Sequence, residues 1–156
     1  MSNTKSKRST HAVTNLKADH QRVKGLFDEF EKTAERATKI TIVSEALEEL
    51  SLHATLEEEL FYPAVREEIG DDDGLMNEAD EEHHVAKILI AELDEMDGTE
   101  SHYDAKFTVL AENVRHHIKE EEENMLPKAQ KTEIDFDALG AKCSAERKNC
   151  SARVCR

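Results

Sequence analysis

Apolar and polar residues alternate along this chain with the period of an α-helix in four long segments. Within each segment apolar side chains recur at steps of three and four residues, which gathers them on one face of an amphipathic helix. The segments span about residues 12–37, 41–66, 76–97 and 107–127. Gly70–Gly74 and Asp97-Gly98 are turn sequences, and Pro127 is expected to end the fourth helix. Short connections make neighbouring helices antiparallel, so the predicted fold is all-α, an up-down-up-down four-helix bundle.

Six positions in these apolar stripes hold ionisable residues instead of apolar ones. Burying an ionisable side chain without a partner costs several kcal/mol, roughly 2–7 even for an uncharged polar group, so such residues need a reason to be there. The six are His20, His53, Glu57, His83, His117 and Glu121.

An internal repeat relates these residues. The stretch 53–63 has His, Glu and Pro at the same offsets as the stretch 117–127. The first and third helices repeat a fainter pattern, His20-x-x-x-Lys24 and His83-x-x-x-Lys87, and the two halves are 63 to 64 residues apart. The repeat predicts that the two halves of the bundle place equivalent side chains around one pseudo-two-fold axis.

The spacing of the repeat suits metal binding. Residues four apart lie on one face of a helix, so each His-x-x-x-Glu pair can direct an imidazole and a carboxylate to the same place in the core. Four imidazoles and two carboxylates suit two adjacent metal ions, with carboxylates bridging and imidazoles terminal. A nitrogen and oxygen ligand set without thiolate favours iron, with manganese and zinc as alternatives. Coordination positions remain for water, hydroxide or a diatomic molecule.

Composition changes this picture little. Leu, Ile, Val and Phe make up 33 of the 156 residues, a small apolar content for a folded chain, which the six polar core positions partly explain. The formal net charge of −14 argues against nucleic acid or an anionic membrane as a partner. The chain offers neither an apolar run long enough for a transmembrane helix nor a signal peptide, which makes the cytoplasm the expected location.

The two ends of the chain are expected to lie outside the bundle. We predict a flexible N-terminus over residues 1–10, the bundle over 11–140, and a basic tail over 141–156. Residues 134–139 could dock as a short cap, and the tail from Lys142 is expected to fray. Cys143, Cys150 and Cys155 match no zinc or redox motif, and they raise the hypothesis that the tail exchanges electrons with the metal site or with a redox partner protein.

The motifs resemble the hemerythrin-like HHE cation-binding domain over about residues 10–140. The resemblance rests on Asp19-His20, on 53–63, on Glu82-His83-His84, and on the stretch from His116 to Pro127. It implies a four-helix bundle with a non-haem di-iron centre, its two irons oxo- or hydroxo-bridged. The implied ligands are His20, His53, Glu57, His83, His117 and Glu121. Members of the family include oxygen carriers, oxygen or iron sensors, and proteins that handle nitric oxide or peroxide.

The chain departs from the family's oxygen carriers at two places. Those carriers have a second His one turn after the third-helix ligand, where this chain has Lys87, and an Asp where it offers Glu121 or Glu122. Neither Glu58 nor Glu122 is expected to be a ligand, although either could turn inward as an extra carboxylate. Tyr62 could hydrogen-bond near the site, but packing beside Pro63 is the preferred expectation.

Three classes of function remain open. The first is a di-iron protein that binds or senses oxygen, nitric oxide or peroxide. The second is a di-iron oxidoreductase that consumes peroxide or nitric oxide, favoured by the imidazole missing at Lys87. The third is a metal-free helical interaction module. The sequence leaves open whether the protein is an enzyme and what its oligomeric state is.

Overall fold

A computed structural model describes residues 11–71 and 73–154 of the chain. The N-terminal residues 1–10, expected to be flexible, and Cys155 lie outside the described residues. Over the described ranges the chain is helical and contains no strand. The elements are α1 (Ala12–Lys32), α2 (Arg36–Leu56), η1 (Glu57–Phe61), α3 (Tyr62–Ile69), α4 (Leu75–Asp94), α5 (Tyr103–Glu120), η2 (Glu121–Met125), α6 (Leu126–Gln130) and α7 (Phe136–Val154).

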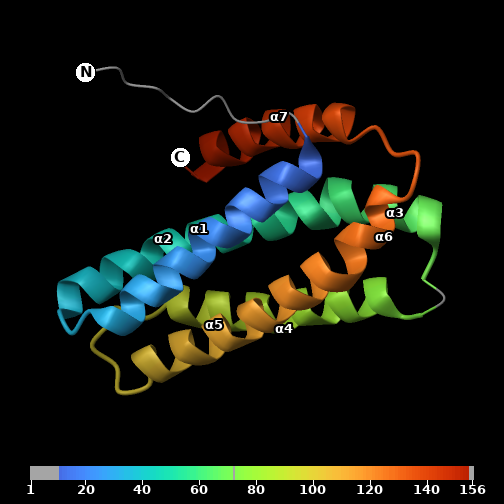
Figure 1. The fold of residues 1–156 in the computed structure, drawn as a ribbon. Helices are drawn as coiled ribbons and strands as arrows, with labels where there is room; N and C mark the ends of the chain where they lie inside the picture. Colours follow the sequence, from blue (N-terminus) through green and yellow to red (C-terminus); the bar gives the residue numbers. More distant parts are fainter. Residues whose placement is uncertain (1–10, 72, 155–156) are drawn as a thin grey trace.

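The predicted four-helix bundle is confirmed. α1 packs beside α2, α4 packs beside α5, and the two pairs meet through contacts of α2 with α4 and of α1 with α5 (Figure 1). The second and fourth helical rods continue through η1 into α3 and through η2 into α6. The connections between the rods are short, as an antiparallel bundle requires.

A π-helical turn follows each His-x-x-x-Glu pair. The backbone N–H of Tyr62 bonds to the carbonyl of Glu57, and that of Leu126 to the carbonyl of Glu121, in each case five residues back. The expectation that the fourth helix ends at Pro127 is wrong, because the helix continues to Gln130. Proline lacks an N–H, and the π turn directly before it lets the helix continue without that donor.

The predicted boundary between the first two helices is also wrong. α1 ends at Lys32 and α2 begins at Arg36, whereas the apolar pattern suggested a first helix to residue 37. Thr33 has extended backbone angles, φ −94° and ψ 142°, and its N–H bonds to the carbonyl of Glu29. The chain reverses direction within residues 33–35, so Ala34, which lies inside the range predicted for the first helix, is exposed.

Two clusters of buried apolar side chains lie along the bundle. One contains Phe27, Phe30 and Phe107 and joins α1, α2, α4 and α5. The other contains Phe61, Met76 and Leu126 and joins α1, η1, α3, α4, η2, α6 and α7. The buried polar residues belong to neither cluster. The core is therefore not one continuous apolar interior, which accounts for part of the low apolar content of the sequence.

The C-terminal segment is more ordered than expected. Residues from Phe136 to Val154 form α7, a helix of 19 residues, where we expected a short cap followed by a frayed tail. α7 packs on α1, α2 and η1, on the outside of the first helical pair (Figure 1). Phe136, Leu139 and Cys143 are buried in this contact. These three side chains thus hold the N-terminal part of α7 on the bundle.

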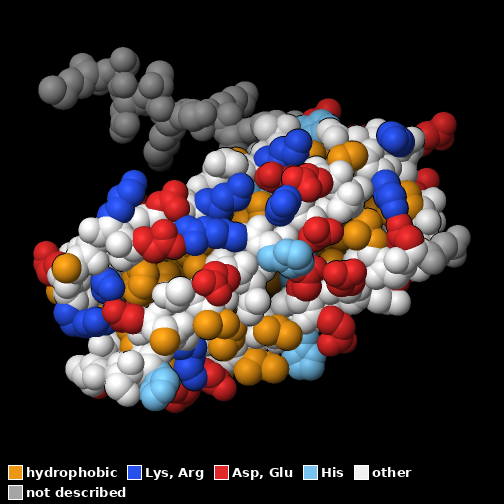
Figure 2. Space-filling model, turned by 60° about the horizontal axis from the view of Figure 1, so that its bottom comes forward, with side chains coloured by type: hydrophobic (Ala, Val, Ile, Leu, Met, Phe, Trp, Pro, Cys, Tyr) orange, Lys and Arg blue, Asp and Glu red, His pale blue; other side chains and the backbone are white. Residues whose placement is uncertain are grey.

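The surface is charged and mixed in sign. On the face shown in Figure 2, acidic and basic side chains lie among one another instead of forming separate patches. Ion pairs at the surface of the protein join neighbouring helices, for example Arg115 of α5 with Asp28 and Glu31 of α1. Among the described residues, none of the helices combines the length and the apolar character that crossing a membrane requires.

Candidate metal site

The six polar core residues meet in the interior of the bundle. His20 comes from α1, His53 from α2, His83 from α4 and His117 from α5, while Glu57 and Glu121 each begin a π turn. All six are buried, with exposed fractions between 0 and 9%. Each His-x-x-x-Glu pair lies on one helical face, as the spacing of four predicts. The structure therefore brings together the whole set that the sequence singled out.

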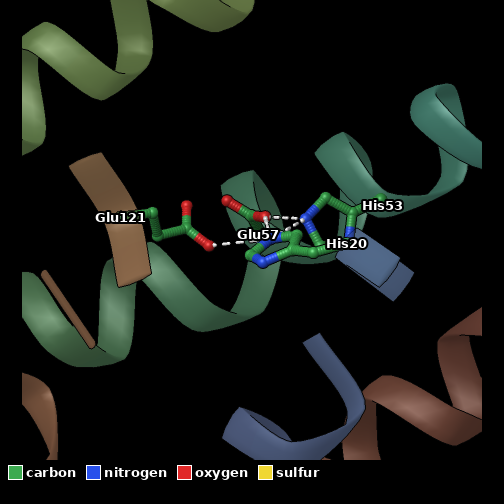
Figure 3. Close-up of side chains that lie close together, drawn as sticks. All are labelled: His20, His53, Glu57 and Glu121. Atoms are coloured by element: carbon green, nitrogen blue, oxygen red, sulfur yellow. Dashed lines mark hydrogen bonds and ion pairs between the residues drawn. The ribbon is translucent and has the colours of Figure 1, made fainter. Parts of the chain in front are cut away.

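The first group of possible ligand atoms contains His20, His53, Glu57 and Glu121 (Figure 3). One atom of each residue lies within 4.8 Å of the others. The Nε2 atoms of His20 and His53 are 3.2 Å apart, and His20 Nε2 lies 3.3 Å from a carboxylate oxygen of Glu121. Nε2 of His53 is paired with Oε1 of Glu57. Two imidazoles and two carboxylates thus converge on one place.

The second group contains His83, His117 and again Glu57. The Nε2 atoms of its two imidazoles are 3.1 Å apart. His83 Nε2 lies 3.5 Å from Oε2 of Glu57, and His117 Nε2 lies 3.2 Å from Oε2 of Glu121. Each carboxylate therefore directs one oxygen to each pair of imidazoles. Two carboxylates placed in this way would be able to bridge two neighbouring ions.

The possible ligand atoms make poor hydrogen bonds with one another and are better suited to bind a cation. Both oxygens of Glu57 and Oε1 of Glu121 are buried, and although imidazole nitrogens lie near them, no hydrogen bond of good geometry reaches them. A buried carboxylate oxygen without a partner costs about 1–3 kcal/mol or more, which a bound cation would offset. Two neighbouring Nε2 atoms that both carry lone pairs cannot hydrogen-bond to each other, whereas both can coordinate the same metal ion. The residues present thus fit a pair of metal ions held by nitrogen and oxygen.

The ionisation of the cluster reflects its charge balance. Burial opposes charge on His20, but hydrogen bonds with Glu121 and Glu57 and their charges outweigh burial and raise its pKa to about 10. Burial opposes charge on His53 as well, yet the charge of Glu57 and a hydrogen bond to Asp19 raise its pKa to about 9. The pKa of Glu57 falls well below its usual value despite burial, because of the charge of His53 and the imidazole nitrogens close to its two oxygens. In the absence of a metal ion, protons on the imidazoles thus balance the negative charge of the carboxylates.

Each imidazole has a second carboxylate near its outer nitrogen, Nδ1. His20 donates to Glu122 at 3.0 Å and His53 donates to Asp19 at 3.3 Å. The corresponding distances in the second half are longer. Nδ1 of His117 lies 3.4 Å from a carboxylate oxygen of Glu82, and Nδ1 of His83 lies 3.6 Å from one of Glu58. A hydrogen bond at Nδ1 fixes the tautomer that leaves Nε2 free to bind a metal ion. The two halves share this pattern, but only the first half makes the hydrogen bonds.

Tyr62 enters the site, contrary to the expectation that it packs beside Pro63. Its hydroxyl donates a hydrogen bond of 2.6 Å to Oε2 of Glu121 and lies 3.3 and 3.2 Å from Nε2 of His83 and His117. Burial, together with the charges of Glu121 and Glu57, raises the pKa of Tyr62 well above its usual value. The repeat has Leu126 at the equivalent position. The hydroxyl therefore makes the second half of the site chemically different from the first.

A small cavity borders the four imidazoles. Its volume is about 40 Å³, enough for one or two small molecules. Most of its other lining residues are apolar, among them Val23, Leu50, Ala86, Ile90 and Val114. Lys87 also lines it, but its side chain is half exposed and its ammonium group is paired with Glu58 at 2.6 Å. Lys87 thus does not replace the imidazole that the family's oxygen carriers have at this place.

The sequence pattern predicted the six inner residues but not all of the side chains around them. That the six residues bind metal stays a prediction. Asp19 and Glu82 precede equivalent histidines in the two halves, and this was the signal that could have assigned them a role. Glu58 and Glu122, expected on solvated faces, are about a quarter exposed and lie beside imidazoles. Arg147, whose guanidinium hydrogen-bonds Asp19, carried no signal in the sequence.

Comparison with known proteins identifies the family of the chain. Residues 11–129 match the hemerythrin HHE cation-binding domain. An uncharacterized hemerythrin-like protein of Schizosaccharomyces pombe is 25% identical over 130 residues, which are 83% of this chain and 64% of that protein. The chain therefore corresponds to somewhat under two thirds of the length of this relative. A crystal structure of a hemerythrin HHE cation-binding domain-containing protein from Mycobacterium kansasii aligns with a TM-score of 0.74 and 24% identity, over 92% of this chain and 88% of the other.

Proposed function

The chain belongs to the hemerythrin HHE cation-binding domain family, and on this basis we propose that it is a non-haem di-iron protein that binds or senses oxygen or a related small molecule. One ion would be held by His20 and His53 and the other by His83 and His117, with Glu57 and Glu121 bridging the two. The observation that carries the proposal is that two buried imidazole pairs share the same two carboxylates.

The surroundings of the site support a small uncharged guest. The cavity beside the imidazoles is lined mostly by apolar residues, which suits oxygen, nitric oxide or hydrogen peroxide better than an ion. Six protein ligands for two six-coordinate ions leave positions open for such a molecule. Bound iron would offer these open coordination positions and would be able to change its oxidation state. The protein's own residues would fix the imidazoles, limit the size of the guest and hold a proton at the hydroxyl of Tyr62.

The test of this proposal is metal analysis combined with absorption spectroscopy. Protein purified from its own host should contain about two irons per chain, with an absorption that changes on reduction and on addition of azide or oxygen. His83→Ala should lose this response. His84→Ala is the matched control, because His84 is the next residue and its side chain is 66% exposed. A protein with another metal, or with no response of the metal spectrum to these molecules, contradicts the proposal.

A second candidate is an oxidoreductase that consumes peroxide or nitric oxide at the same site. It is favoured by the position of Lys87, which is paired with Glu58 and leaves α4 with a single imidazole in the cluster. Fewer ligands mean a more open ion. Steady-state turnover that disappears in His117→Ala would favour this candidate, and a fully loaded protein without turnover would remove it.

The metal-free interaction module is the remaining alternative. It would have to hold two buried carboxylates whose oxygens, apart from the bond to Tyr62, have only poorly aligned contacts with imidazoles, which argues against it. Purified protein without transition metal, unchanged in stability by chelators, would nevertheless establish it.

A further inference from the structure

The helix α7 lies outside the part of the chain that matches the family, yet it contacts the metal site. The match ends at residue 129, and α7 begins at Phe136. α7 packs on α1, α2 and η1, the elements that hold His20, His53 and Glu57. Cys143 is buried in this contact, and Arg147 lies one helical turn further on. One face of α7 therefore covers the first half of the site.

Arg147 reaches this half through a buried carboxylate. Its Nη2 donates to Oδ2 of Asp19 at 2.5 Å, and the same oxygen accepts the hydrogen bond from Nδ1 of His53 at 3.3 Å. Asp19 is only 2% exposed, and the side chain of Arg147 is 18% exposed. A guanidinium that bonds a buried carboxylate restricts the rotation of that carboxylate. Arg147 thus holds the acceptor that in turn orients the imidazole of His53.

The other half of the repeat lacks this arrangement. Glu82 stands where Asp19 stands in the first half and faces His117 at 3.4 Å. Nδ1 of His117 nevertheless has no hydrogen bond of good geometry, and no Lys or Arg within residues 11–71 and 73–151 forms an ion pair with Glu82. His53 and His117 are equivalent in sequence but differ in how firmly their outer nitrogens are held. The difference coincides with the presence of α7 on one side.

We propose that Arg147 is a positioning residue for the metal site, acting through Asp19 to fix the ring of His53 and slow the release of the ion held by His20 and His53. This rests on the proposed function in that it requires the cluster to bind metal. Loss of a partner that orients a metal-binding imidazole weakens metal binding about 10- to 100-fold. Removing the guanidinium should therefore speed release of one of two ions about 10-fold and leave the other unchanged.

A simple charge effect would act in the opposite direction. Removing a cation near a metal site favours retention of the metal ion, so Arg147→Met would slow release if only charge mattered. Lys148→Met is the matched control, because Lys148 is exposed on the same helix and loses the same charge. Faster release in Arg147→Met with no change in Lys148→Met thus distinguishes positioning from charge.

The experiment uses the full chain loaded with Zn²⁺. Release of zinc to excess chelator is followed with a chromogenic dye for wild type, Arg147→Met, Arg147→Gln and Lys148→Met, after circular dichroism has verified the helical content. Arg147→Gln provides a second neutral variant should Met prevent folding. In parallel, NMR of histidine labelled with ¹⁵N follows solvent exchange of the ring protons. We expect faster exchange at His53 in the Arg147 variants and no change at His117.

The measurements distinguish a positioning role of Arg147 from a general structural role. Faster release of one ion with faster exchange at His53 supports the proposal, and so does the finding that Arg147→Met adds nothing in an Asp19→Ala background. Release and exchange at wild-type rates in folded Arg147 variants overturn it while leaving the proposed function intact. Equal acceleration of both ions also overturns it, because it indicates general loosening. A wild-type chain that takes up no metal contradicts the proposed function itself.

Discussion

The hydroxyl of Tyr62 donates a hydrogen bond of 2.6 Å to Glu121, a contact for which the other half of the repeat offers only the side chain of Leu126. The bond joins the π-helical turn regions of the two half-chains at the centre of the bundle. It also gives a buried carboxylate the neutral donor that it needs. The six inner residues of the site are therefore related by the repeat, whereas the side chains that hydrogen-bond to them differ between the two halves.

Removing this hydroxyl should destabilise the metal-free protein. Tyr62→Phe keeps the ring in place but leaves Oε2 of Glu121 without its donor, at a cost of about 1–3 kcal/mol in the free energy of unfolding. Urea denaturation measures this cost. Tyr103→Phe is the control, because no hydrogen bond of the Tyr103 hydroxyl is found among the described residues, and it should change stability by less than about 0.5 kcal/mol. Equal effects of the two variants would contradict the assigned role of Tyr62.

Glu57 should matter more for metal content than any single imidazole. Its carboxylate lies in both groups of possible ligands, whereas His53 lies in one. Glu57→Gln is expected to weaken uptake of both ions, each by at least the 10- to 100-fold that loss of an outer partner costs, and His53→Ala chiefly one. Isothermal titration with Co²⁺ resolves the two steps. Glu59→Gln, at an exposed position two residues on, should bind like wild type. Retention of both sites in Glu57→Gln would rule out a shared carboxylate.

Removing the metal should lower the melting temperature. A ligand that binds only the folded state at 100 times its Kd stabilises that state by about 2.7 kcal/mol, and the buried carboxylate oxygens of Glu57 lose this partner on chelation. Calorimetry of the loaded and the chelated protein measures the difference. Identical melting temperatures would show that the polar cluster is stable without metal.

Two glycines should respond to alanine in opposite ways. Gly98 has φ of +97°, and a Cβ there would meet the side chain of Ile40 at 2.5 Å, so Gly98→Ala should destabilise the fold by about 1–2 kcal/mol. Gly25 lies within α1, where an added Cβ meets nothing within 4 Å. Gly25→Ala should stabilise by about 0.5–1 kcal/mol. Thermal melts of the two variants provide the comparison, and equal signs would contradict it.

The ion pairs of Asp104 should give stability that disappears in acid. Asp104 accepts hydrogen bonds from Arg36 at 2.6 and 3.0 Å and from Lys39 at 3.0 Å, and these lower its pKa to about 2. A lowered pKa in the folded state means that the stabilisation is complete above the ordinary carboxyl pKa of about 4 and is lost as pH falls toward 2.

Asp104→Asn should therefore be less stable than wild type at pH 7, with the difference vanishing near pH 2. The difference should be only about 0.5–1 kcal/mol, because the pair is exposed and screened by solvent. Urea titrations between pH 7 and pH 2 measure it, with Asp94→Asn, at an exposed position, as control. A constant difference across this range would show that ionisation of Asp104 is not its cause.

The sequence determined the bundle and the inner residues of the site, because both depend on helical period. Apolar steps of three and four define the buried face of each helix, and His53 and Glu57 share that face because they are four residues apart. The repeat relates these two residues to His117 and Glu121 through identical offsets along the chain. Such local regularities do not depend on how the helices are arranged.

Only the tertiary structure decided which side chains reach the site from other helices. Tyr62 lies five residues beyond Glu57, and the π turn between them directs its hydroxyl into the second group of imidazoles. Arg147 is 128 residues from Asp19, a contact that follows from the packing of α7 and not from any spacing in the sequence. The helical period fixes the face of each residue, whereas packing between helices fixes its partners. The asymmetry of the site, and the role of α7 in it, are therefore properties of the folded chain.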